Sequence, residues 1–120
     1  MTNIGLEYRN SHDMVQEAVS EALDHADMKI SEIHAIVSSC MDMATNSERQ
    51  KHSSTMLSTL FKKRIPIIKV PAGCAGGGQA LWTSLKLKYD NTLVIGFERL
   101  MTNTTKIITD EILTGGQRIY

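Results

Sequence analysis

The strongest constraint on the fold is an alternation between two kinds of segment. Short, apolar, β-branched runs of the kind that form buried strands occur at residues 33–38, 66–70 and 92–98. Stretches with the 3.6-residue period of amphipathic helices occur at residues 12–27, 47–63 and 75–88. Strands that alternate with helices are joined by crossover connections. The sequence therefore predicts an α/β fold, with a mostly parallel sheet and helices packed on it.

Residues near two of the predicted helix ends suit those positions. Ser11 is predicted as the N-cap of the first helix, with Asp13 close to the positive end of the helix dipole. Lys62, Lys63 and Arg64 are cations that suit the carbonyl end of the second helix, so we expect that helix to end there. Pro66 is tolerated only because it lies near the start of its strand.

The composition is that of one globular unit, and we expect a single domain over residues 1–120. Thirteen basic residues balance 13 acidic ones, and 42% of the chain is hydrophobic. A neutral chain of this kind does not suggest a nucleic-acid partner or an anionic membrane surface. The longest apolar runs span only a few residues and the amino terminus lacks an export pattern, so a cytoplasmic location is predicted. Both cysteines are then expected to be reduced.

The segment with the strongest chemical signal is the glycine-rich turn around Cys74. Backbone amides and the positive end of the following helix both stabilise a thiolate, the form in which cysteine acts as a nucleophile. The next glycines, Gly76, Gly77 and Gly78, leave the backbone open to a substrate carbonyl, so we predict that they support the turn and an oxyanion. The alternative is that Cys74 is a small core residue and that the glycines only permit tight packing of helix on sheet.

Other kinds of site have weaker support. The glycines follow neither the G-x-G-x-x-G order nor the Gly-Lys-Ser/Thr ending of nucleotide-binding loops. No metal-ligand spacing relates Cys40 to the histidines, which are His12, His25, His34 and His52. No metal site is expected, and the histidines are interpreted as solvated or structural. Cys40 follows a predicted strand, so it is expected near the same edge of the sheet as Cys74, in a packing role.

Three motifs, in the same order along the chain, resemble the thiolase superfamily. Residues 70–81, Val-Pro-Ala-Gly-Cys-Ala-Gly-Gly-Gly-Gln-Ala-Leu, resemble the nucleophile segment, in which a strand leads into Cys-Ala-Ser-Gly-Gly or Cys-Ser-Ser-Gly and a helix. Residues 46–50, Asn-Ser-Glu-Arg-Gln, are similar to the Asn-Pro-Ala-Arg-Gln turn that opens the preceding helix. Residues 93–99 resemble the later Gly-x-Glu strand. The resemblance covers about residues 11–103.

The resemblance implies a thiolase-like half-fold in an acyltransferase of lipid metabolism. Cys74 would accept the acyl group of acetyl-coenzyme A or another acyl-coenzyme A, so coenzyme A enters as substrate and no cofactor is implied. Gly76 stands where many thiolases have serine, and Leu100 where they often have methionine. Ketoacyl synthases and hydroxymethylglutaryl-CoA synthases share the cysteine-helix arrangement and remain an alternative. A non-catalytic interaction module with the same fold is a second alternative.

The resemblance also implies a partner. Members of the superfamily are several-fold longer and carry a Gly-His-Pro histidine and a Cys-x-Gly cysteine in a second half. This chain has no Gly-His-Pro, and no Cys-x-Gly outside the predicted nucleophile segment itself. We therefore expect an amino-terminal half or small subunit, with a clipped first strand, that lacks the general base and the oxyanion histidine. The expected partner is a second copy, with residues 92–98 at the dimer interface, or a complementary carboxyl-terminal half.

Overall fold

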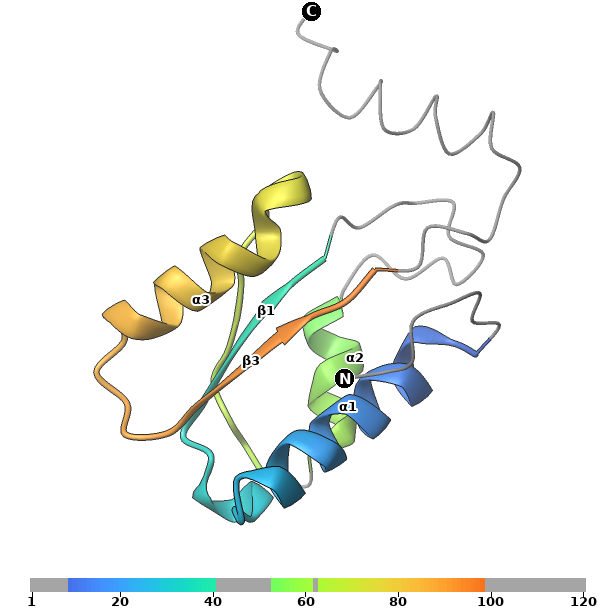
Figure 1. Ribbon diagram of the computed structural model, residues 1–120, viewed down its shortest axis with the longest axis vertical. Helices are drawn as coiled ribbons and strands as arrows, with labels where there is room; N and C mark the ends of the chain where they lie inside the picture. Colours follow the sequence, from blue (N-terminus) through green and yellow to red (C-terminus); the bar gives the residue numbers. More distant parts are fainter. Residues whose placement is uncertain (1–8, 41–52, 62, 99–120) are drawn as a thin grey trace, which may run out of the picture.

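The computed structural model describes residues 9–40, 53–61 and 63–98. Its sheet has three strands, β1 (Ala35–Ser39), β2 (Ile67–Lys69) and β3 (Thr92–Gly96). The middle strand, β1, pairs in parallel with both neighbours, which gives the order β2-β1-β3 (Figure 1). Each strand overlaps a run predicted from the sequence. The predicted α/β class and the parallel sheet are therefore confirmed.

Helices cover both faces of this sheet, and they are α1 (Ser11–His25), α2 (Ser53–Leu60) and α3 (Gly76–Lys86). α1 and α2 contact each other on one face, whereas α3 packs on β1 and β3 from the other face (Figure 1). β2 and β3 lie on opposite sides of β1, so right-handed crossovers require α2 and α3 to lie on opposite faces. Among the described residues, no helix combines the length and the apolar character needed to cross a membrane.

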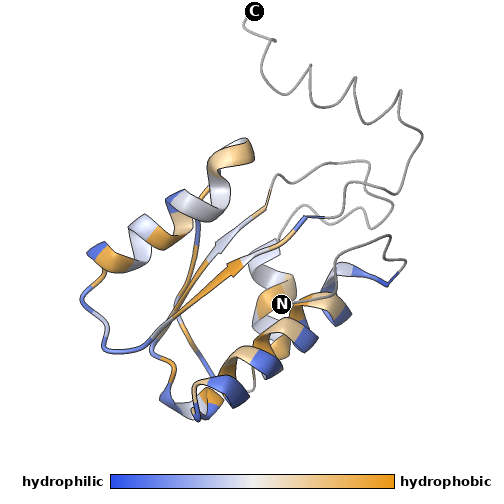
Figure 2. Ribbon diagram, in the orientation of Figure 1, coloured by the Kyte–Doolittle hydropathy of each residue, from blue (hydrophilic) through white to orange (hydrophobic). Residues whose placement is uncertain are grey.

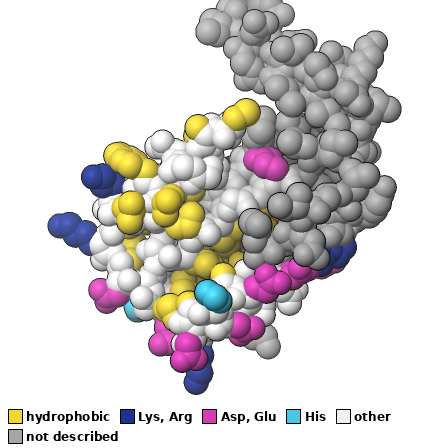
Figure 3. Space-filling view, in the orientation of Figure 1, with side chains coloured by type: hydrophobic (Ala, Val, Ile, Leu, Met, Phe, Trp, Pro, Cys, Tyr) yellow, Lys and Arg dark blue, Asp and Glu magenta, His cyan; other side chains and the backbone are white. Residues whose placement is uncertain are grey.

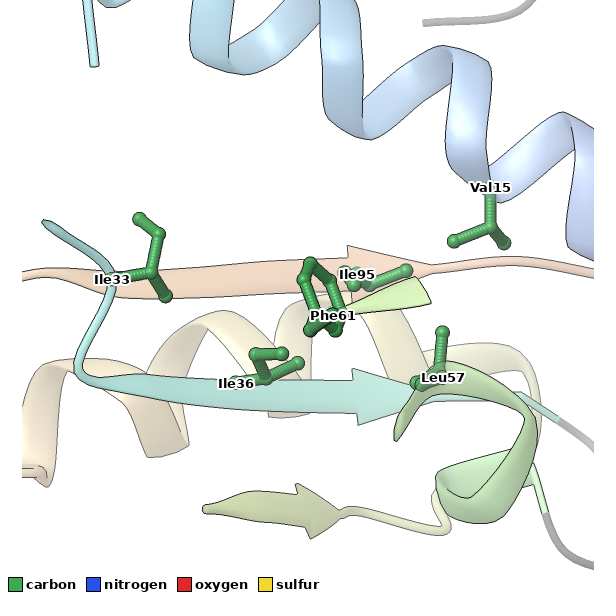
Figure 4. Close-up of a cluster of buried hydrophobic side chains, with 6 residues drawn as sticks. All are labelled: Val15, Ile33, Ile36, Leu57, Phe61 and Ile95. Carbon is green, nitrogen blue, oxygen red and sulfur yellow. The ribbon is translucent and has the colours of Figure 1, made fainter. Parts of the chain in front are cut away.

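The hydrophobic core lies between the sheet and the pair α1 and α2 (Figure 4). Its buried side chains are Val15, Ile33, Ile36, Leu57, Phe61 and Ile95. Side chains alternate along a strand, so Val37 faces away from this core, toward α3, where Ala80 is also fully buried. Figure 2 shows hydrophobic residues along the strands and hydrophilic residues in the loop between α3 and β3. The central strand is therefore buried on both of its faces.

The start of α1 corrects the predicted cap. Asn10, not Ser11, is the N-cap, and its side-chain oxygen accepts a hydrogen bond of 2.8 Å from the backbone N–H of Asp13. Ser11 is the first helical residue and is only 1% exposed. The sequence places two capping residues side by side, and the burial of Ser11 leaves Asn10 in the capping position.

The end of α2 also differs from the prediction. The helix ends at Leu60, before the basic residues that were expected to close it. Phe61 turns into the core, and the Lys63 ammonium donates a hydrogen bond of 2.9 Å to the Ser31 carbonyl oxygen. These two contacts end the helix and direct the chain toward β2. The predicted first part of this helix, residues 47–52, lies outside the described residues.

The end of α1 contains an aspartate in the left-handed backbone region. Asp27 has φ +52°, and its N–H donates to the Asp24 carbonyl at 3.2 Å. The N–H of Met28 donates to the Leu23 carbonyl at 2.9 Å, which completes a Schellman motif. Glycine is the usual residue at this position because a β-carbon is strained there. This helix end is therefore less stable with aspartate at position 27 than it would be with glycine.

We expect Asp27→Gly to raise the free energy of unfolding by about 0.5–1 kcal/mol, because glycine adopts this conformation without strain. Ala26→Gly is the matched control. Ala26 has a right-handed backbone with φ −84°, so glycine there is expected to lower stability. Urea unfolding followed by circular dichroism measures both changes. Equal effects of the two substitutions would contradict the interpretation.

Candidate functional site

Cys74 lies at the carboxyl edge of the sheet, in a 3₁₀ turn over Gly73–Ala75 that connects β2 to α3. Gly73 has φ +49°, in the left-handed region that favours glycine. The N–H of Ala75 donates a hydrogen bond of 3.0 Å to the carbonyl oxygen of Ala72, which closes the turn. The Cys74 side chain is exposed. The turn thus lies directly before a helix, as expected from the sequence, and the structure adds that its thiol is accessible to solvent.

A depression of about 270 Å³ opens beside this thiol. The strand ends and the turn both contribute to its lining, which includes Ser39, Gly73, Cys74, Gly77, Gly96 and Glu98. Three of these residues are glycines, so backbone rather than side chains forms much of the wall. Ligands of parallel α/β sheets bind outside the carboxyl ends of the strands, which is where this depression lies.

Backbone hydrogen bonds hold the wall of the depression together at the end of β1. The N–H of Phe97 donates to the Ser39 carbonyl at 3.2 Å, which keeps the chain after β3 beside β1. On the other side, the N–H of Val70 donates to the Ser38 carbonyl at 2.8 Å, which does the same for the chain after β2. Both segments that carry the site are therefore positioned by β1.

Gly76 has a packing role at the contact between α3 and β1. A β-carbon added at Gly76 would lie 3.2 Å from the β-carbon of Ser39 and closer still to the Ser39 hydroxyl. Any larger residue at this position would therefore force Ser39 to move. The N–H of Gly76 donates to the Gly73 carbonyl, so this amide is already engaged in the turn.

The other two glycines predicted to support the site, Gly77 and Gly78, are exposed in the first turn of α3. An added β-carbon would meet nothing within 4 Å at either position. No side chain caps the start of α3 within the described part of the chain. The first turn of this helix is thus open to a ligand, and the oxyanion role of these glycines stays a prediction.

The two cysteines differ in burial. Cys40 directly follows β1 and is 8% exposed, which fits the packing role predicted for it, whereas Cys74 is exposed. Both lie at the carboxyl edge of the sheet, as expected from their positions after strands. Only Cys74 is accessible to a large substrate in this structure.

The described histidines, His12, His25 and His34, do not line the depression beside Cys74. His25 and His34 are exposed, and the Nδ1 atom of His12 lies 3.5 Å from Asp13 Oδ1. His52 is outside the described residues. In the described ranges, no three histidine, cysteine, aspartate or glutamate side chains are arranged to hold a metal ion.

Sequence reasoning missed the part of the depression contributed by the strand ends. Ser39, Gly96 and Glu98 line it together with Cys74, although they are far apart along the chain. A signal for them was present, because Ser39 directly follows one predicted strand, Gly96 and Glu98 are among the last three residues of another, and parallel strands end at a common edge. Strand order was needed to use that signal, and the sequence alone did not supply it.

Comparison with models of protein families finds no match to this chain, and no curated protein sequence matches it. The assignment of a function therefore depends on the geometry around Cys74 and on the motif resemblance.

We expect Gly76→Ala to lower the free energy of unfolding by about 1–3 kcal/mol, because the new methyl group overlaps the Ser39 side chain. The same change in an S39A background is expected to cost less, since the hydroxyl is then absent. Gly77→Ala is the control and is expected to be neutral or stabilising. A double-mutant cycle from urea unfolding measures the coupling. An equal cost in both backgrounds would show that Ser39 is not the obstacle.

We expect iodoacetamide at neutral pH to alkylate Cys74 at least about tenfold faster than Cys40 in the folded protein, because only Cys74 is exposed. Peptide mass spectrometry over a time course gives both rates. In urea the two rates are expected to converge. A Cys74 rate above that of a free cysteine derivative indicates thiolate stabilisation by the turn. Equal rates for the two cysteines in the folded state would contradict the placement of Cys74.

Proposed function

We propose that this chain is a thiolase-like acyltransferase of the acetyl-CoA C-acyltransferase type, in which Cys74 carries the acyl group as a thioester. The observation that carries the proposal is an exposed thiol at the start of α3, beside a depression walled largely by backbone. An acyl thioester is bulky at its leaving group, so the nucleophile must be reachable from solvent. Cys74 meets this requirement and Cys40 does not.

The acyl-loading step uses chemistry that the turn favours. The Cys74 thiolate adds to the thioester carbonyl carbon of acyl-coenzyme A, and the carbonyl oxygen becomes negative. The bond from that carbon to the coenzyme A sulfur then breaks, and the departing thiolate takes up a proton. The acyl group remains on Cys74 Sγ. Amides in the first turn of α3 and the positive end of its dipole stabilise both the thiolate and the oxyanion.

Thiolysis or condensation of the bound acyl group needs further groups. A base must move a proton and a donor must polarise the thioester oxygen. We propose that these come from a partner, either a complementary carboxyl-terminal half or a second copy, and that the protein works with reduced thiols in the cytoplasm. Among the described residues β3 pairs only with β1, and we propose that its other edge makes the dimer contact at residues 92–98.

Acyl loading is common to thiolases, ketoacyl synthases and hydroxymethylglutaryl-CoA synthases, so the proposed step applies to each of these enzyme types. The second candidate function is a non-catalytic interaction module. The observation that favours it is the outward side of α3, where Leu81, Trp82 and Leu85 are exposed. Reactivity of Cys74 separates the two candidates, because a purely structural thiol would not accept an acyl group.

We expect incubation with acetyl-coenzyme A to add one acetyl group per chain at Cys74, detected by intact-protein and peptide mass spectrometry. Hydroxylamine should remove it, as it cleaves thioesters. C74A is expected to fold, as judged by circular dichroism, and to remain unmodified. C40A is the matched control and should retain the acetyl group. Acetylation that persists in C74A, or that is absent from the wild-type chain, would contradict the acyltransferase proposal.

A further inference from the structure

The outward side of α3 carries an unusual hydrophobic surface, which we call the α3 strip. It consists of Leu81, Trp82 and Leu85 on the helix and Tyr89 just after it. Leu85 is 75% exposed, and the others are between 45% and 56% exposed. Figure 3 shows hydrophobic side chains gathered over this helix. Together they expose on the order of 500 Å², near the upper end of what a monomer leaves in water.

The strip is shaped to receive a second helix. Gly78 and Leu85 are seven residues apart, so they lie almost on one line along α3, with Leu81 and Trp82 on either side of that line. An added β-carbon at Gly78 would meet nothing within 4 Å, so space stands open above it. The strip therefore has one protruding side chain, Leu85, and, two helical turns away, an open space over Gly78 that could receive such a side chain.

We propose that the α3 strip binds the α3 strip of a second copy of this chain. The two helices run antiparallel about a two-fold axis that passes between Leu81 and Trp82. This arrangement seats Leu85 of each copy in the space over the partner's Gly78. The same contact therefore forms twice, as in any self-complementary two-fold interface. A standard interface buries roughly 800 Å² per partner, so about 300 Å² of the surface around the strip would have to be buried in addition to the strip itself.

Charge favours a second copy as the occupant. Lys86 and Lys88 lie at the carboxyl end of α3 and are exposed, and Lys86 stands 5.4 Å over the Trp82 ring. Glu98 lines the depression with Gly77, so the acidic residue lies at the opposite end of the same helix. Antiparallel pairing brings the lysines of each copy toward the end of the partner's helix near which Glu98 lies. It also sets the two helix dipoles in opposite directions.

The pairing has a consequence for the site at Cys74. In this register Tyr89 of one copy comes level with the Cys74 turn of the other copy, and Lys86 comes level with the partner's Gly77. Each chain would then supply polar side chains to the rim of the other's depression. The inference concerns a different surface from the β3 edge, and it does not require that Cys74 transfers acyl groups.

Sedimentation of the full chain tests the contact. We expect a concentration-dependent species of twice the 13.3 kDa chain mass. L85E is expected to raise the dissociation constant at least about tenfold, because it places a charge in the apolar space over the partner's Gly78. A22E, at an exposed position of α1, is the matched control and should leave the dissociation constant unchanged. Circular dichroism confirms that both variants fold.

Cross-linking tests the register. In a C74S background, the cysteine of L81C lies beside the two-fold axis, close to the same cysteine of the second copy. A mild disulfide-forming oxidant is therefore expected to yield a covalent dimer. A22C in the same background should not. A chain that is monomeric at all concentrations would overturn the proposal, as would a dimer that survives L85E and leaves L81C unlinked. The second result would move the contact to another surface. Neither result depends on whether Cys74 accepts an acetyl group, so this proposal and the acyltransferase proposal can fail separately.

Discussion

The arrangement of this protein depends on β1, which is hydrogen-bonded on both edges and covered on both faces. Ile36 faces α1 and α2, and Val37 faces α3, and neither is exposed to solvent. β1 also positions the two segments that follow its neighbouring strands. Its carbonyls at Ser38 and Ser39 accept hydrogen bonds from the chain after β2 and from the chain after β3. The candidate site is built from those two segments, so its geometry is a property of the central strand.

The close approach of α3 to β1 links that strand to the chemistry. Gly76 lets the helix come so near that the Ser39 side chain occupies the place of a β-carbon. The same approach fixes the start of α3, and with it the turn that exposes Cys74. One glycine therefore serves packing, while the next two leave the first turn of the helix open. A single glycine-rich segment thus combines a structural requirement with an accessible nucleophile.

α3 is apolar on both sides, and the two sides have different roles. Gly76 and Ala80 face the sheet and are buried, which explains why the helix packs as it does. Leu81 and Leu85 face outward and are exposed, so packing within the described part of the chain does not account for their hydrophobic character. A helix with this distribution is typical of an element enclosed between two layers. The proposed second copy supplies the missing layer next to the site.

The α/β class, the three strands of the parallel sheet, the helices between them and the place of Cys74 in a turn before a helix could all be predicted from the amino-acid sequence. These follow from hydrophobic period and turn composition, which are local properties. Three features could be learned only from the folded chain: Asn10 rather than Ser11 caps α1, α2 ends at Leu60, and Ser39 and Glu98 line the depression beside Cys74. Such features depend on burial and strand order, which bring together residues that no local pattern connects.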